Sequence, residues 1–199
     1  MRFKDKVVLV VGGNSGIGLA AARKFAEEGG LVIITGRNPQ TLREVEQQIP
    51  GAVSYEADIA DPDAMAPVIR ACEELHGRID VLFVNAGVGA FARVEEVTPE
   101  LWDQVHSVNL RGCFFAIQRA LPLLSDGAAI VITGSIGATA PLPGNAVYAA
   151  AKAGLRAVAR ILAKELVGRK IRVNVVSPGP TETPLIKRNI GMDDGMIDA

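Results

Sequence analysis

Two residues of the sequence, Tyr148 and Lys152, could carry out acid–base chemistry together. Three residues separate them, and side chains at positions i and i+4 lie next to each other on one side of a helix. A phenol in water ionises at about pH 10, and a nearby cation favours the charged tyrosinate form. Such a pair could give or accept a proton near neutral pH, which general acid–base catalysis requires. The chain has only 2 tyrosines, so a chance match to this spacing is uncommon.

A cluster of glycines follows the first apolar run of the chain. Gly12, Gly16 and Gly18 come directly after residues 7–11, with the spacing Gly-x3-Gly-x-Gly. Glycines permit a tight turn and a close approach of a ligand to the backbone, and free N–H groups at the start of a helix favour phosphate. An ordinary strand-to-helix turn is the alternative interpretation. The position after an N-terminal strand favours a dinucleotide site.

Polar residues also follow the later apolar runs. Arg37 follows the second run, where an acidic residue usually meets the ribose 2′-hydroxyl of NAD and an arginine suits the 2′-phosphate of NADP. The absence of a competing carboxylate favours NADP (NADPH) over NAD, and a solvated arginine on a turn is the alternative. Asp58 follows the third run, Asn85-Ala86-Gly87 the fourth and Ser135 the fifth. Each of these alone could be an ordinary turn residue.

Apolar runs alternate with amphipathic segments along the whole chain. Strands are predicted at residues 7–11, 31–35, 52–57, 79–84, 128–133 and 171–176. Helices are predicted at 16–28, 39–48, 61–76, 98–124 and 145–168, and two of them begin with a capping residue followed by proline, Asp61-Pro62 and Thr98-Pro99. Right-handed βαβ units predict an α/β fold, a Rossmann-like doubly wound parallel sheet of at least six strands with helices on both faces. Ligands of such sheets bind at the carboxyl ends of the strands.

Composition excludes several classes of protein. The 199 residues suit a single domain, residues 1–199. A hydrophobic content of 49% argues against disorder, and 21 Lys+Arg against 22 Asp+Glu argue against a nucleic-acid binder. Cys72 and Cys113 have no metal-site spacing, so we expect reduced cysteines in a cytoplasmic protein. No apolar run is long enough for a membrane span, and His76 and His106 lack nearby ligands, so no metal is expected.

Together these motifs resemble the short-chain dehydrogenase/reductase family of NAD(P)-dependent oxidoreductases. The resemblance extends from about residue 6 to residue 183. The motifs fall in the family's order: Gly12-x3-Gly16-x-Gly18, Asp58, Asn85-Ala86-Gly87, Asn109, Ser135, Tyr148-x3-Lys152 and Pro178-Gly179. Val11 departs from the pattern, because threonine is common there, and this should affect strand bracing more than chemistry.

The resemblance implies roles for individual positions. The catalytic residues would be Asn109, Ser135, Tyr148 and Lys152. Asn109 would hold a water molecule and Ser135 would bind the substrate. Tyr148 would act as the general acid and base, and Lys152 would supply the positive charge beside it. The cofactor would contact Gly12, Asn14, Ser15, Ile17, Arg37, Asp58, Ile59, Asn85, Ala86, Gly87, Tyr148, Lys152, Pro178, Gly179, Thr181 and Thr183. Asn85 would chiefly brace the sheet. The substrate would be a small ketone, aldehyde or secondary alcohol, in a pocket bordered by Val88, Phe91, Ile136, Gly137, Ala138, Leu142 and Leu185.

Two further expectations concern assembly and the C-terminus. The segment 145–168 is apolar nearly all round, which predicts a helix buried on every side. Related proteins pair this helix and the preceding long helix across a two-fold axis, so we expect a homodimer. Family members usually continue for several dozen residues past Pro178-Gly179, and the substrate lid and last strand are therefore expected to be missing or shortened here.

Two alternative functions remain open at this stage. One is a non-catalytic NADP-binding regulatory protein on the same fold, or a truncated member with little turnover. The other is a Rossmann-like methyltransferase that binds S-adenosylmethionine. The presence of Asn109, Ser135, Tyr148 and Lys152 together argues against a regulatory protein. These residues and Arg37 argue against a methyltransferase.

Overall fold

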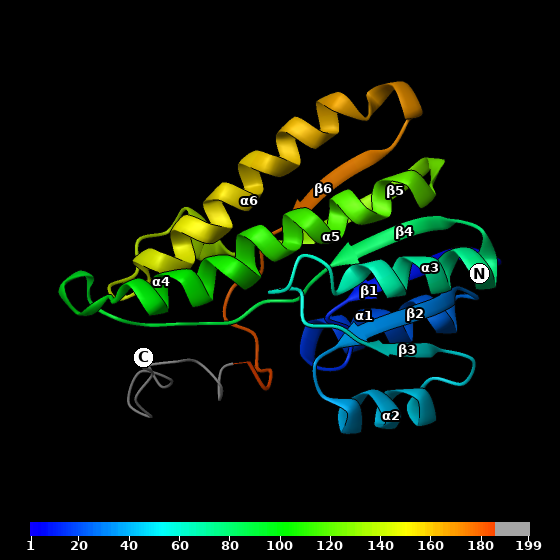
Figure 1. Cartoon of the computed structure of the whole chain (residues 1–199), viewed down its shortest axis with the longest axis horizontal. Coiled ribbons are helices and arrows are strands. Elements are labelled where there is room, and N and C mark those ends of the chain that lie inside the picture. Colours follow the sequence, from blue (N-terminus) through cyan, green and yellow to red (C-terminus); the bar gives the residue numbers. More distant parts are fainter. Residues whose placement is uncertain (186–199) are drawn as a thin grey trace.

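A six-stranded parallel sheet forms the centre of the molecule (Figure 1). The computed structural model describes residues 1–185. The sheet has the order β3-β2-β1-β4-β5-β6, which confirms the predicted Rossmann-like doubly wound fold. Its strands are β1 (Val7–Val11), β2 (Leu31–Gly36), β3 (Val53–Glu56), β4 (Ile79–Val84), β5 (Leu124–Thr133) and β6 (Arg172–Val176).

Strand β1 shows how the sheet separates two apolar cores. All five of its residues are buried, and successive side chains of a strand point to opposite faces. Val7, Leu9 and Val11 join one core, which includes residues of α3, α5 and α6, whereas Val8 and Val10 join the other, which includes residues of α1 and α2. Burial on both faces explains why the strand is a continuous apolar run.

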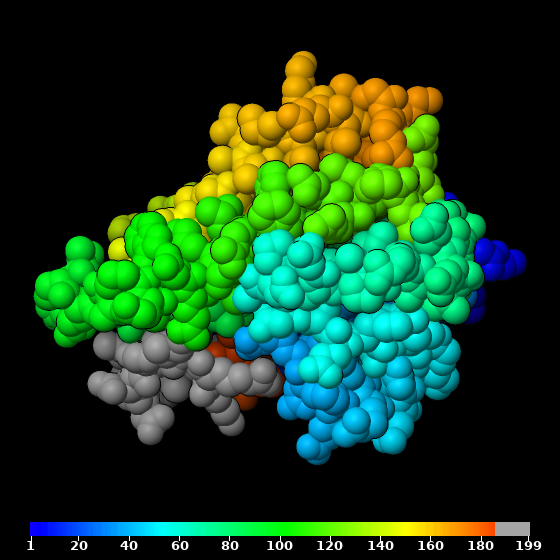
Figure 2. Space-filling model, viewed as in Figure 1, coloured from blue at the N-terminus to red at the C-terminus, as the bar shows by residue number. Residues whose placement is uncertain are grey.

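Six α-helices lie within residues 1–185, of which α4 packs against α6 and the other five cover the two faces of the sheet. They are α1 (Gly16–Glu27), α2 (Pro39–Gln48), α3 (Met65–His76), α4 (Pro99–His106), α5 (Cys113–Ala120) and α6 (Ala146–Glu165). Figure 2 shows the side chains of α3, α5 and α6 covering one face of the sheet. None of the helices in this part of the chain combines the length and apolar character needed to cross a bilayer.

The structure confirms the predicted start of α4 but not that of α3. Thr98 caps α4 as expected, because its Oγ1 accepts a hydrogen bond of 3.2 Å from the N–H of Leu101. The predicted start at Asp61-Pro62 is wrong, since α3 begins at Met65. The Asp61 carboxylate instead accepts a hydrogen bond of 2.9 Å from the N–H of Asp63, which closes a local turn before the helix.

The predicted helix over residues 98–124 is not uniform. A π-helical segment, Ser107–Gly112, joins α4 to α5, and Asn109 lies within it, fully buried. Such segments are rare and are frequent at functional sites. The helix also ends early, in a short 3₁₀ turn at Leu121–Leu123, because β5 begins at Leu124 rather than at residue 128.

Candidate active site

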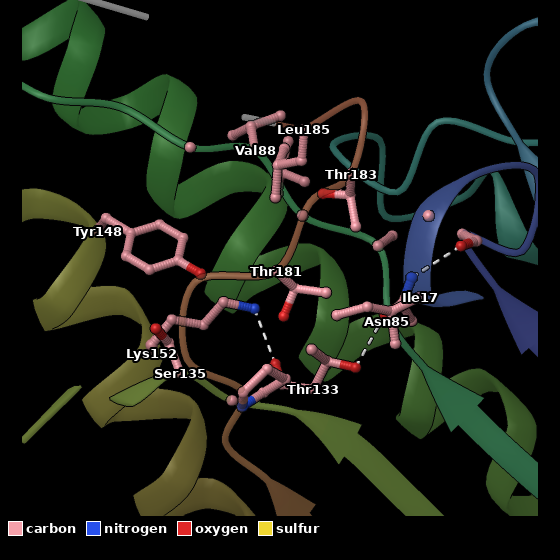
Figure 3. Close-up of a pocket in the computed structure, with 18 of the residues that line it drawn as sticks. Ile17, Asn85, Val88, Thr133, Ser135, Tyr148, Lys152, Thr181, Thr183 and Leu185 are labelled. Atoms are coloured by element: carbon pink, nitrogen blue, oxygen red, sulfur yellow. Dashed lines mark hydrogen bonds between the residues drawn. The ribbon is translucent and has the colours of Figure 1, made fainter. Parts of the chain in front are cut away.

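A cleft of about 1230 Å³ lies at the carboxyl ends of the strands. Its lining includes every residue that the sequence suggests for cofactor contact, together with Ser135, Tyr148 and Lys152. Figure 3 shows part of this lining, with Ile17 and Asn85 on one side and Tyr148 and Lys152 on the other. Asn109 is fully buried and is not among the residues that line the cleft. The parallel topology thus gathers residues that are up to about 170 positions apart in the sequence.

The glycine loop between β1 and α1 forms one end of this cleft. Gly12 has a φ of +79°, and a Cβ there would lie 2.6 Å from the Cα of Ala86. Gly16 has a φ of +53°, which also disfavours any other residue. The N-cap residue of α1, Ser15, makes no side-chain capping hydrogen bond. The first N–H groups of α1 are therefore available to an anion, and the loop fits a diphosphate group.

Arg37 and Asp58 form an ion pair next to this loop. Arg37 Nη1 lies 3.5 Å from Asp58 Oδ2, and their side chains are 59% and 47% exposed. The adjoining turn is held by Asn14, whose Nδ2 donates a hydrogen bond of 2.7 Å to Thr41 Oγ1. The pair is open to solvent, so the Arg37 guanidinium retains N–H donors for a second anion.

Tyr148 and Lys152 both extend from α6 into the opposite end of the cleft (Figure 3). Lys152 Nζ lies 5.8 Å from the centre of the Tyr148 ring. The lysine is only 3% exposed, and its Nζ donates a hydrogen bond of 2.8 Å to the backbone carbonyl of Thr133. An ammonium has three N–H donors, so this bond fixes the position of Lys152 and leaves donors for other groups.

Ser135 stands directly after β5 and faces the same space. Its Oγ accepts a hydrogen bond of 3.1 Å from the N–H of Gly137. A hydroxyl carries one donor and can accept at its lone pairs. The Ser135 hydroxyl can therefore donate its own proton to a ligand oxygen while the backbone holds it in place.

Two asparagines, the fully buried Asn109 and the partly buried Asn85, hold the loops around the cleft. Asn109 Nδ2 donates to the carbonyl of Val88 at 2.7 Å, and its Oδ1 accepts from the N–H of the same residue at 2.9 Å. The side chain of Asn109 is thus engaged with the loop after β4. Asn85 Nδ2 donates to Gly12 O at 2.9 Å, and its Oδ1 accepts from Thr133 Oγ1 at 3.0 Å. Asn85 therefore links the ends of β1, β4 and β5, as the bracing role requires.

The two cysteines are free thiols inside the apolar core that includes residues of α3, α5 and α6. Burial raises the pKa of Cys72 to about 12. Burial also raises the pKa of Cys113, although the Lys152 charge acts in the opposite direction. Neither environment favours the reactive thiolate. In the described part of the chain, no three His, Cys, Asp or Glu side chains gather as a metal site.

Among the residues of the cleft wall that the sequence analysis does not predict are Thr133 and Asn145. Thr133 supplies the carbonyl that binds Lys152, and the only indication of it was its place at a strand end. Asn145 lines the cleft at the start of α6, and the sequence analysis places it only at the beginning of the predicted helix 145–168. Of the residues expected around the substrate, only Ala138 is absent from the lining.

Comparisons with known proteins agree with this geometry. Residues 11–199 match the family model described as enoyl-(acyl carrier protein) reductase. The chain is 39% identical over 194 residues to 3-oxoacyl-(acyl-carrier-protein) reductase FabG of Thermotoga maritima, covering 94% of this chain and 79% of that protein. A short-chain dehydrogenase/reductase from Serratia marcescens has a TM-score of 0.91 and 32% identity, covering 100% of this chain and 82% of that one.

A further solved structure is relevant to the cofactor. The 3-ketoacyl-(acyl-carrier-protein) reductase from Brucella melitensis, complexed with NADH, has a TM-score of 0.88 and 32% identity, covering 94% of this chain and 80% of that one. The family model covers most of the sequence, and the similarity to the Thermotoga maritima protein covers most of both chains. The chain therefore belongs to the short-chain dehydrogenase/reductase family of NAD(P)-dependent oxidoreductases.

Proposed function

We propose that this chain is an NADP(H)-dependent oxidoreductase that interconverts a ketone or aldehyde and an alcohol, with Tyr148 as the general acid and base. The observation that carries the proposal is the arrangement of Tyr148, Lys152 and Ser135 at one end of a cleft whose other end is a glycine loop at a helix N-terminus. A dinucleotide that reached from the loop to these residues would place its reactive ring beside a proton donor.

The residues of the cleft fit a nicotinamide dinucleotide along its length. The diphosphate would lie against the loop of Gly12, Asn14, Ser15 and Ile17, where a Cβ at Gly12 would clash with Ala86. Other lining residues would hold the remaining parts: Asp58 and Ile59 the adenine, Asn85, Ala86 and Gly87 a ribose, and Pro178, Gly179, Thr181 and Thr183 the nicotinamide end. When bound, the reduced nicotinamide supplies the hydride that reduces a carbonyl carbon.

The protein's own residues would handle the proton. Ser135 donates a hydrogen bond to the carbonyl oxygen of the substrate and holds it near the Tyr148 hydroxyl. As that oxygen gains negative charge, Tyr148 transfers its proton to it, and the alcohol forms. Lys152 stabilises the resulting tyrosinate, because its charge is buried and held by Thr133. In the oxidation direction, Tyr148 accepts the proton from the alcohol.

Arg37 supports a preference for NADP over NAD. It follows β2, where an acidic residue would favour the 2′-hydroxyl of NAD. Within residues 1–185, its guanidinium is paired only with Asp58, at 3.5 Å and in contact with solvent. A 2′-phosphate carries more charge than one carboxylate and can be bound through two N–H groups of arginine. Arg37 would therefore bind the phosphate, either after releasing the Asp58 carboxylate or through N–H groups that Asp58 does not use.

We also propose that the protein is a cytoplasmic homodimer in which each copy is a single NAD(P)-binding domain. The dimer would form through the long helices α4–α5 and α6. Phe114 on α5 and Ile161 on α6 are exposed by 36% and 60%, and a second copy would cover such apolar side chains. Both cysteines are free, which suits a reducing compartment.

The function can be tested with the purified chain. NADPH binding is measured by fluorescence titration, and turnover by NADPH oxidation with a panel of ketones and aldehydes. Binding with turnover supports the proposal. Binding without turnover would instead support a regulatory protein, and binding of S-adenosylmethionine in place of NADPH would support a methyltransferase.

A further inference from the structure

Asn145 carries an unusual atom for the interior of a protein. Within residues 1–185, its Oδ1 is the one buried side-chain nitrogen or oxygen atom without a hydrogen-bond partner. The residue is only 4% exposed. Buried polar groups nearly always have partners, and leaving one without a partner costs free energy. The amide therefore needs an explanation other than the stability of the fold.

The ordinary explanation, helix capping, does not apply to Asn145. It occupies the N-cap position of α6, but its side chain makes no capping hydrogen bond. Asn38 occupies the same position on α2, and its Oδ1 accepts hydrogen bonds from the N–H groups of Gln40 and Thr41. The same residue type at the same position thus caps one helix but not the other. In α6 the amide lies in the wall of the cleft.

Asn145 lies beside the groups that would bind the reacting oxygen. It precedes Tyr148 by three residues at the start of α6, and residues at this spacing are neighbours on a helix. Its Nδ2 lies 2.6 Å from the position that a Cβ on Gly137 would take. The N–H of Gly137 in turn donates to Ser135 Oγ at 3.1 Å. The amide thus lies next to the turn that holds Ser135, three residues before Tyr148 in the chain.

We propose that Asn145 determines substrate specificity by forming a hydrogen bond with a second oxygen of the substrate, a hydroxyl or carbonyl on a carbon close to the reacting carbon. This inference rests on the proposed function, because it assumes a carbonyl oxygen held by Ser135 and Tyr148. The rest of the substrate would then extend past Asn145, whose amide offers both donors and an acceptor. The substrate class is a hydroxyketone or dicarbonyl rather than a plain hydrocarbon ketone.

The physical basis is the cost of leaving the amide unpaired. A site that is built to bind a hydroxyl rejects an analogue without it, because the buried polar group of the protein then has no partner. Apolar residues of the lining, Ile136 and Leu142, provide no alternative hydrogen bond near Gly137. Asn145 is therefore the residue on which discrimination between the two kinds of ketone would depend.

The test compares hydroxyacetone with butanone, which have the same number of heavy atoms. We measure kcat/KM for both ketones with NADPH, in the unmodified protein and in Asn145→Leu. The ratio of the two values should favour hydroxyacetone and should fall by roughly tenfold in the variant. The intrinsic reactivities of the two ketones cancel when the ratio for the variant is divided by the ratio for the unmodified protein. An unchanged ratio would overturn the inference.

Asn38→Leu is the matched control, since Asn38 is also an N-cap asparagine that lines the cleft, at its opposite end. It should leave the substrate ratio unchanged, and an equal fall in both variants would count against a local role of Asn145. If the unmodified protein reduces no carbonyl at all, the proposed function fails, and the inference fails with it. Turnover with an unaltered ratio in Asn145→Leu defeats the inference alone.

Thermal unfolding gives a second and independent measurement. Because the Asn145 amide has no partner for its Oδ1, replacement by leucine should leave the unfolding midpoint unchanged or raise it. Asn38→Leu should lower the midpoint, since it removes a cap. A fall of more than about 4 °C in Asn145→Leu would show that the amide stabilises the fold, and this result would overturn the proposal.

Discussion

The Lys152 ammonium lies 5.8 Å from the centre of the Tyr148 ring and is bound by the backbone carbonyl of Thr133 at 2.8 Å. The carbonyl comes from the last residue of β5, whereas both side chains come from α6. The distance between the charge and the phenol is thus set by the packing of a helix on a sheet rather than by a flexible side chain. A fixed charge next to a proton donor is what electrostatic preorganisation requires.

Replacement of Tyr148 by phenylalanine should abolish the proton transfer and little else. We expect Tyr148→Phe to bind NADPH with similar affinity and to lose about a thousandfold in kcat with any carbonyl substrate. Fluorescence titration and steady-state NADPH oxidation measure the two quantities. Circular dichroism controls for folding. Turnover within tenfold of the unmodified protein would assign the proton to another group.

A change at Arg37 should alter the choice of cofactor. In Arg37→Asp, we expect the ratio of kcat/KM with NADPH to that with NADH to fall by roughly 10- to 100-fold, because a charged hydrogen bond is lost and a carboxylate is introduced. Arg43→Asp makes the same change of charge on the exposed side of α2, outside the cleft lining. If both variants shift the ratio equally, the effect comes from overall charge and not from a phosphate contact.

Asp80 should make stability depend on acid pH. Burial alone would raise the pKa of Asp80, but a hydrogen bond of 2.9 Å from the N–H of Val7, together with Arg78 and Lys6, lowers the pKa overall. A carboxyl with a depressed folded-state pKa stabilises the fold above its unfolded pKa of about 4. This contribution is lost as the pH falls through the folded value.

The experiment for Asp80 is urea unfolding between pH 7 and pH 3. Asp80→Asn should lose about 1–3 kcal/mol of unfolding free energy at pH 7. The difference between the two proteins should shrink as the pH falls below about 4. A difference that stays constant over this range would mean that the charge of Asp80 contributes nothing to stability.

The two thiols should be unreactive in the folded protein. Cys72 has a pKa of about 12, and burial raises that of Cys113 as well. Since the thiolate is the nucleophile, we expect no alkylation by iodoacetamide at pH 8 in native buffer and complete alkylation of both residues in urea. Mass spectrometry counts the modified residues. Rapid modification of Cys113 in the native protein would indicate that its surroundings open to solvent.

The sequence predicts the fold well because apolar periodicity is a local property. Continuous apolar runs such as residues 7–11 identify strands that are buried on both faces. The polar residues at the strand ends could be located for the same reason, since the topology of a parallel sheet brings those ends to one edge. Arg37 and Asp58 follow different strands, and their positions at strand ends predict the region in which they form an ion pair.

The remaining features depend on tertiary contacts that no local pattern encodes. The carboxylate of Asp61 binds Asp63 instead of capping α3, and both uses suit the same local sequence. The π-helical segment around Asn109 accompanies two hydrogen bonds to Val88, a residue 21 positions away. The missing cap at Asn145 likewise depends on how α6 meets the turn at Gly137.

The spacing of residues along α6 has a consequence for how such a site can change. Tyr148 and Lys152 are four residues apart within α6, so they share one side of the helix, whereas Asn145 is the N-cap residue that precedes it. A residue inserted between Asn145 and Tyr148 would change the position of the amide, while the Tyr148–Lys152 spacing would be preserved. The segment before Tyr148 can therefore diverge to suit new substrates, whereas the proton donor and its cation remain paired.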